Sequence, residues 1–136
     1  MPWPDLPKRV HSSLKILCSL AKAGRPLQAG RIAHLQHIPP ARAAKILQLL
    51  TWAGFVRSRR GMNGGYWLEV PADRIRIGDV LTFFDSRSPA RKPKSDDITK
   101  ALRKVTDSVR KTFEQLTIAS LSEFATTGRT REGGGR

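Results

Sequence analysis

The spacing of the apolar residues changes once along this chain, at Gly54, and this change restricts the fold more than any other feature. Before Gly54 the apolar residues recur every three or four positions, as they do on amphipathic helices. After it, residues 55–59 and 66–70 are rich in aromatic and β-branched side chains and flank the glycine-rich stretch 60–65. Such a pattern is typical of a β-hairpin with a flexible tip. The sequence therefore predicts a mainly α fold with a small β-hairpin.

Four helices are predicted in the first part of the chain. The first covers residues 8–23 and stops at Gly24, and a shorter apolar pattern follows at residues 27–35. The third helix begins after Pro39, since proline fits the first turn of a helix, and runs to about Ala53. A short fourth helix is expected at residues 77–84. Three helices followed by a two-stranded ribbon is the order of elements in a winged helix-turn-helix domain.

The net charge is +14, of which +9 falls in residues 1–70 and +5 in residues 71–136. A basic excess of this size indicates a polyanionic partner, because each phosphate that a protein neutralises releases counterions. Nucleic acid is favoured over an anionic membrane. The charge by itself carries no information about sequence preference.

The second part of the chain is divided by a basic, proline-interrupted linker. We expect a DNA-binding domain at 1–84, a linker at 85–95, a dimerisation helix with a following short helix at 96–125, and a disordered tail at 126–136. The helix has a heptad seam with spacings of 4, 3, 4, 3 and 4, formed by Ile98, Leu102, Val105, Val109, Thr112 and Leu116. The seam predicts self-association, with packing of the helix on its own domain as the alternative.

In their order along the chain, these segments resemble the Rrf-type winged helix-turn-helix transcriptional regulators of bacteria. The resemblance covers residues 8–125 and is carried by the segments 9–21, 32–33, 38–50, 53–58, 60–68, 77–81 and 116–121. It implies a homodimer that binds a roughly palindromic operator in double-stranded DNA, usually as a repressor. It further implies that the third helix enters the major groove and the wing enters the minor groove.

Candidate DNA-binding residues follow from this arrangement. On the third helix, Arg42, Lys45 and Gln48 have the donor and acceptor groups that match guanine and adenine edges. Gln28 and Arg31, at the start of the second helix, are expected to anchor phosphates. The wing adds Arg57, Arg59, Arg60, Asn63 and Tyr66. The glycines of the wing, Gly61, Gly64 and Gly65, are expected to let its backbone approach the DNA closely.

The single cysteine, Cys18, excludes an intramolecular disulfide. Members of the resembled family that sense through an iron–sulfur cluster have three cysteines between the short helix and the dimer helix, and residues 85–99 contain none. We therefore expect no cluster, no other cofactor and no bound metal. An effector protein, a small ligand at the dimer interface, oxidation of Cys18 or no signal at all remain open, and Cys18 is more often a small packed hydrophobe.

Other candidate sites are weaker. His34 and His37 make a poor metal site without a nearby carboxylate or thiolate. The three tryptophans, Trp3, Trp52 and Trp67, are expected to pack within the domain. No catalytic constellation is present, so an enzyme is not expected.

A signal peptide and a membrane span are also not expected, and the cysteine usage favours the cytoplasm. Two alternatives to a sequence-specific regulator stay open. One is a nucleic-acid-binding protein that uses charge alone, and the other is a protein-interaction module whose DNA binding is vestigial.

Overall fold

The computed structural model describes residues 6–85 and 97–133, without the side chains at 85, 99, 102, 103, 105, 106 and 126–133. It is mainly helical, with one two-stranded antiparallel sheet. The elements are α1 (Lys8–Ala23), α2 (Ala29–Gln36), α3 (Pro40–Ala53), β1 (Val56–Arg59), β2 (Gly65–Leu68), the short 3₁₀ helix η1 (Ala72–Arg74), α4 (Ile77–Asp85), α5 (Asp97–Gln115) and α6 (Ile118–Gly133). The predicted fold class is confirmed.

The ends of the first three helices follow from a few residues. Gly24 and Gly54 take left-handed conformations, with φ of 61° and 87°, and end α1 and α3. His37 ends α2 in the same way with φ of 53°, although it is not a glycine. Pro40 occupies the first turn of α3, where its missing N–H costs little. His37 and Pro40 together set the sharp turn between α2 and α3.

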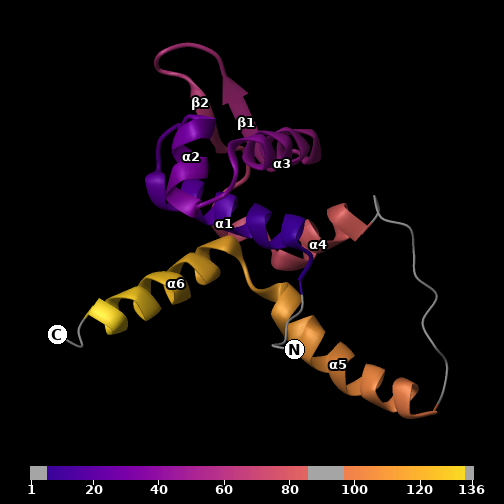
Figure 1. Cartoon of the computed structure of the whole chain (residues 1–136). Helices are drawn as coiled ribbons and strands as arrows, with labels where there is room; N and C mark the ends of the chain where they lie inside the picture. Colours follow the sequence, from indigo (N-terminus) through magenta and orange to yellow (C-terminus); the bar gives the residue numbers. More distant parts are fainter. Residues whose placement is uncertain (1–5, 86–96, 134–136) are drawn as a thin grey trace.

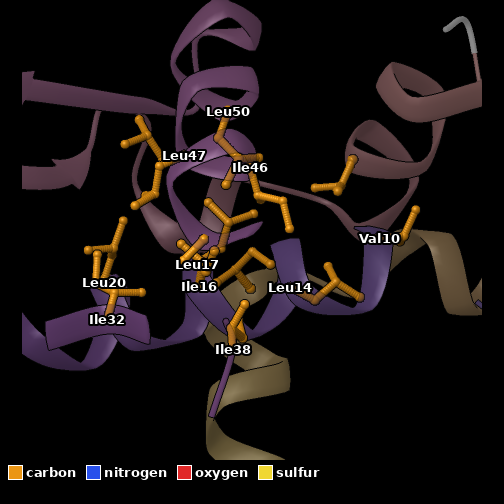
Figure 2. Packing of buried hydrophobic residues seen from close by; sticks show 14 of the residues in the cluster. Val10, Leu14, Ile16, Leu17, Leu20, Ile32, Ile38, Ile46, Leu47 and Leu50 are labelled. Atoms are coloured by element: carbon orange, nitrogen blue, oxygen red, sulfur yellow. The ribbon is translucent and has the colours of Figure 1, made fainter. Parts of the chain in front are cut away.

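The hydrophobic core lies between α1 and α3 and continues toward α4 (Figure 2). Leu17 of α1 and Leu47 and Leu50 of α3 have no exposed surface, and Ile32 attaches α2 to the same cluster. Figure 2 shows the side chains of Leu17 and Ile46 directed toward one another from α1 and α3. Because the inward faces of these helices are fixed by packing, the outward faces are fixed as well.

The wing is attached to the helical unit by backbone hydrogen bonds. Strands β1 and β2 pair with Val56 opposite Leu68 and Arg59 opposite Gly65. Leu27, just before α2, adds a bridge to the outer side of β2. Its N–H donates to the carbonyl oxygen of Tyr66 at 2.9 Å, and the N–H of Tyr66 donates back at 2.7 Å. The hairpin is therefore joined to the segment that leads into α2.

Helices α5 and α6 lie on the side of α1 away from the wing, and α5 projects outward from the rest of the molecule (Figure 1). Their junction is joined to the segment before α4. The N–H of Ile77 donates to the carbonyl oxygen of Leu116 at 2.8 Å, and the N–H of Ile118 donates to that of Ile75 at 2.9 Å. The side chain of Ile118 has no exposed surface. The beginning of α6 thus shares the core of the first three helices.

Two features differ from the sequence-based expectations. Helix α6 continues to Gly133, into the segment 126–136 for which a disordered tail is predicted. A single glycine, Gly128, costs a helix only about 1 kcal/mol relative to alanine and does not have to end it. Trp52 is 65% exposed rather than packed, because it lies on the outward face of α3, whereas Trp67 is half-buried. Trp3 lies outside the described residues.

The predicted boundaries between the DNA-binding domain, the linker, the dimerisation segment and the tail, at residues 84, 95 and 125, stay a prediction. Nearly all of the linker lies outside the described residues. None of the helices in residues 6–85 and 97–133 combines the length and the apolar character that a membrane crossing requires.

Candidate nucleic-acid interface

Helix α3 presents a polar face to solvent. Arg42, Lys45 and Gln48 are exposed, while Ala43 and Leu47 on the other side of the helix are buried in the core. The side chains of Arg42 and Lys45 make no ion pair among the described residues. Their donors are therefore available to an outside partner, as the sequence predicts.

Gln28 lies at the start of α2, as expected, but its side chain has partners within the chain. Its side-chain amide nitrogen donates to the carbonyl oxygens of Gly64, at 3.1 Å, and Gly61, at 3.4 Å. An amide group has two N–H donors, and both are directed to the wing rather than toward solvent. The sequence could not show this contact, because the partners lie more than thirty residues away. Gln28 holds the tip of the wing against the start of α2.

The side chains around this contact form a basic hollow of about 430 Å³ between the start of α2 and the wing tip. Arg25, Arg31 and Asn63 are among its lining residues. Arg25 and Asn63 also line a second hollow of about 500 Å³, together with Arg59. Arg25 was not among the predicted contacts. The only sign in the sequence that Arg25 belongs to this surface was its position directly after Gly24, which ends α1 just before the second helix.

Two glycines of the wing, Gly64 and Gly65, lie directly against the backbone of the chain itself. A Cβ atom on Gly65 would lie 2.6 Å from the carbonyl oxygen of Leu27, and one on Gly64 would lie 2.1 Å from that of Arg59. Both glycines are buried. We expected these glycines to let the backbone approach DNA. At Gly64 and Gly65 the close approach is instead to the protein's own backbone. Gly61 is exposed and has open space around it.

Two of the predicted wing residues have partners within the chain. The guanidinium of Arg57 forms an ion pair with the carboxylate of Glu69 at 3.2 Å. Tyr66 is half-buried and packs against the hydrophobic core. Arg59, Arg60 and Asn63 are exposed at the end of the hairpin. The free positive charge of the wing is therefore concentrated at its tip.

The electrostatic character of this surface follows from a long stretch without acidic residues. Between Asp5 and Glu69 the sequence has eleven Lys and Arg residues and no Asp or Glu. This stretch includes all of α1, α2, α3 and both strands. The N-terminal ends of α2 and α3 add to the positive potential, because a helix dipole is positive at that end. No acidic residue in the first turn of either helix offsets it. The result is a surface suited to a polyanion.

The described residues offer little for metal binding. No group of three or more His, Cys, Asp or Glu side chains within 6–85 and 97–133 is close enough to hold an ion. His34 and His37 are exposed near the end of α2, and the N–H of His37 donates to the carbonyl oxygen of His34 at 3.3 Å. Cys18, the only cysteine of the chain, lies in α1 and is half-buried.

The chain is similar to known transcriptional regulators over most of its length. Residues 6–123 match the Rrf2 family, which is described as iron-dependent transcriptional regulators. A protein of Synechocystis sp. that is provisionally named an HTH-type transcriptional regulator is 32% identical over 85% of this chain and 80% of its own length.

Solved structures show the same fold. Staphylococcus aureus CymR has a TM-score of 0.72 at 28% identity and covers 86% of this chain and 97% of its own. T. potens IscR has a TM-score of 0.74 at 22% identity and covers 90% of this chain and 89% of its own. The family match and the exposed basic winged helix agree, and we conclude that the chain is a DNA-binding transcriptional regulator of the Rrf2 family.

Proposed function

We propose that the chain is a homodimeric repressor that binds an operator in double-stranded DNA through α2, α3 and the wing. The observation that carries this proposal is the exposed basic surface on these elements, which no acidic residue interrupts between Asp5 and Glu69. A non-specific binder would need only the charge. The polar side chains on the outward face of α3, on a helix fixed by its buried face, favour base-edge contacts as well.

The side chains divide into two functional groups. Arg42, Lys45 and Gln48 read base edges in the major groove, where arginine and lysine match guanine and glutamine matches adenine. Arg59 and Arg60 enter the minor groove, which attracts arginine where it is narrow. The phosphate contacts come from basic and polar side chains around the two hollows, namely Arg25, Arg31 and Asn63.

Dimerisation is assigned to α5. Among the seam residues, Ile98 is 74% and Val109 is 47% exposed, although both are large and apolar. The side chains of Leu102 and Val105 lie outside the described residues, and Leu116 is half-buried against its own core. A helix of nineteen residues is about 30 Å long. This is close to the roughly 34 Å between half-sites one helical turn apart.

The regulatory signal differs from that of a cluster-binding regulator. The family is described as iron-dependent, but one cysteine and the absence of a metal-binding group among the described residues do not fit a centre with three cysteine ligands. We propose a cytoplasmic regulator without catalytic activity that responds to an effector protein or a small ligand.

The proposal is tested by measuring binding to the DNA upstream of the chain's own gene and to a scrambled duplex, at two salt concentrations. We expect tighter binding to the upstream DNA at both. Replacing Arg42 with alanine is expected to cost about 1–3 kcal/mol on the specific duplex, as for other base-reading arginines. The same change should have a much smaller effect on the scrambled duplex.

The matched control is Lys100→Ala, which removes an exposed charge from α5, outside the proposed DNA-binding surface. It should leave specific binding unchanged. Equal and steeply salt-dependent binding to both duplexes would instead indicate a protein that uses charge alone. Binding that survives both Arg42→Ala and Arg60→Ala would indicate that this surface serves a different partner.

A further inference from the structure

A cavity of about 440 Å³ lies on the opposite side of α1 from α3, between α1, the end of α5 and α6. Its apolar wall is formed by side chains from all three helices, including Leu14, Phe113 and Leu121. Pockets that bind small molecules usually have volumes of about 300–1,000 Å³ and mostly apolar walls with a few polar groups. The size and composition of this cavity are therefore those of a ligand site.

The polar groups of the cavity come mainly from one face of α1. His11, Lys15, Cys18 and Lys22 follow one another at helical spacing and all line it. None of the described lining residues is acidic. Lys22 makes no hydrogen bond or ion pair among the described residues. A cation without a partner at the edge of an apolar cavity favours a ligand that carries a negative charge.

We propose that this cavity binds a small amphipathic carboxylic acid, with its apolar part against Leu14, Phe113 and Leu121 and its carboxylate at Lys22. Helix α5 of a second copy is a poorer occupant, because its exposed side chains carry more positive than negative charge and would bring like charges to those of α1. The positive ones are Lys100, Lys104, Arg110 and Lys111, against Asp97 and Asp107. An uncharged apolar ligand would leave Lys22 without a partner.

The cavity is connected to the DNA-binding unit through Gln36, the last residue of α2, which forms part of its wall. The ammonium group of Lys15 donates to the carbonyl oxygen of Gln36 at 3.2 Å, and the side-chain amide of Gln36 donates to the hydroxyl of Ser19. A ligand that fills the cavity contacts Gln36 directly, because Gln36 is part of the cavity wall. We expect a shift at the end of α2 and a change in operator affinity, a consequence that rests on the proposed function.

Calorimetric titration of the full chain with sodium decanoate tests the site without DNA. We expect saturable binding of decanoate and much weaker binding of decylammonium, which has the same chain and the opposite charge. Lys22→Gln should weaken decanoate binding roughly tenfold, the effect of losing one charged hydrogen bond. The control Lys100→Gln should bind decanoate as the unaltered chain does. Ala125→Trp, at an exposed position of the cavity wall, should block binding without disturbing the core.

Cys18 gives a second measurement, because it lines the cavity and is the only cysteine of the chain. Saturating decanoate should slow the reaction of this thiol with a thiol-specific reagent, and decylammonium should not. Ala125→Trp should abolish the protection by decanoate.

The outcomes separate the two proposals. Absence of decanoate binding, equal binding by Lys22→Gln, or equal binding of decylammonium overturns the ligand site and leaves operator binding untouched. Decanoate binding by a chain that does not bind its upstream DNA overturns only the proposed function. If decanoate binds and operator affinity stays the same, the connection through Gln36 is wrong.

Discussion

At the scale of single residues, Cys18 makes a prediction about pH dependence. Partial burial raises the pKa of this thiol above its ordinary value, while a hydrogen bond with Ser122 and the positive charge of Lys22 lower it in part. A raised pKa means less thiolate at a given pH, and the thiolate is the reactive form. We expect the alkylation rate of the folded chain to reach half its maximum at a higher pH than in denaturant, as measured by mass spectrometry.

Lys22→Gln should displace this profile further upward, because it removes a charge that favours the thiolate. Lys8→Gln, which removes a charge from the first turn of the same helix, serves as the control and should have no such effect. If Lys22→Gln leaves the pH of half-maximal alkylation unchanged or lowers it, Lys22 does not stabilise the thiolate of Cys18.

Cys18 and Gln28 also show where sequence reasoning stops at this scale. The helical spacing of the apolar residues places Cys18 beside the apolar stripe of α1, and the side chain is half-buried there. Its neighbour Ser122 lies about a hundred residues later, on a helix whose packing no local pattern predicts. For Gln28 the sequence indicated a phosphate contact and gave no sign of the hydrogen bonds to the wing, because the wing residues are distant in sequence. The exposure of the polar face of α3 was predictable from helical spacing, whereas the partners of Cys18 and Gln28 were not.

At the scale of elements, the attachment of the wing depends on Gly65. This residue has φ of 131°, which L side chains rarely adopt, and an added Cβ would meet the carbonyl oxygen of Leu27. We expect Gly65→Ala to lower the free energy of unfolding by about 1–3 kcal/mol, the usual cost of one strained backbone conformation. Urea denaturation measures this loss. Operator affinity should fall as well, because the wing is no longer held at the start of α2.

Gly30→Ala is the matched control for this change. Gly30 lies inside α2 with an ordinary φ, and nothing lies within 4 Å of the position that its Cβ would occupy. Alanine there should raise the free energy of unfolding by about 0.4–1 kcal/mol, because it restricts the unfolded chain. A loss of stability in both variants would indicate that the wing attachment is not the cause.

The elements themselves were well predicted because their signals are local. Apolar spacing, the glycines at 24 and 54 and the prolines at 39 and 40 were sufficient to locate α1, α3 and the hairpin. The bridge between Leu27 and Tyr66 escaped prediction because an isolated backbone pairing leaves no pattern in side chains. The extent of α6 was missed because a glycine-containing polar segment lacks an apolar stripe, the feature on which the prediction relied.

At the scale of the whole molecule, the exposed seam of α5 has to be covered by a second copy if the regulator binds two half-sites. We expect Val109→Asp to convert the dimer to a folded monomer, because burying an unpaired carboxylate in the interface is costly. Sedimentation equilibrium measures the change in mass, and circular dichroism checks that the helices remain. Since α5 packs on the core only near its end, through Phe113 and Leu116, stability of the monomer unit should be largely retained.

Loss of the dimer removes the gain from engaging two half-sites at once, which is roughly 10²–10⁴ in affinity. Operator binding by Val109→Asp should fall within that range, while binding to a single half-site stays the same as for the unaltered chain. Lys104→Asp places the same carboxylate on an exposed position outside the seam and should remain dimeric. If Val109→Asp still sediments as a dimer, α5 is not the interface. The dimer would then have to use another exposed apolar surface, such as the one around Phe124 of α6.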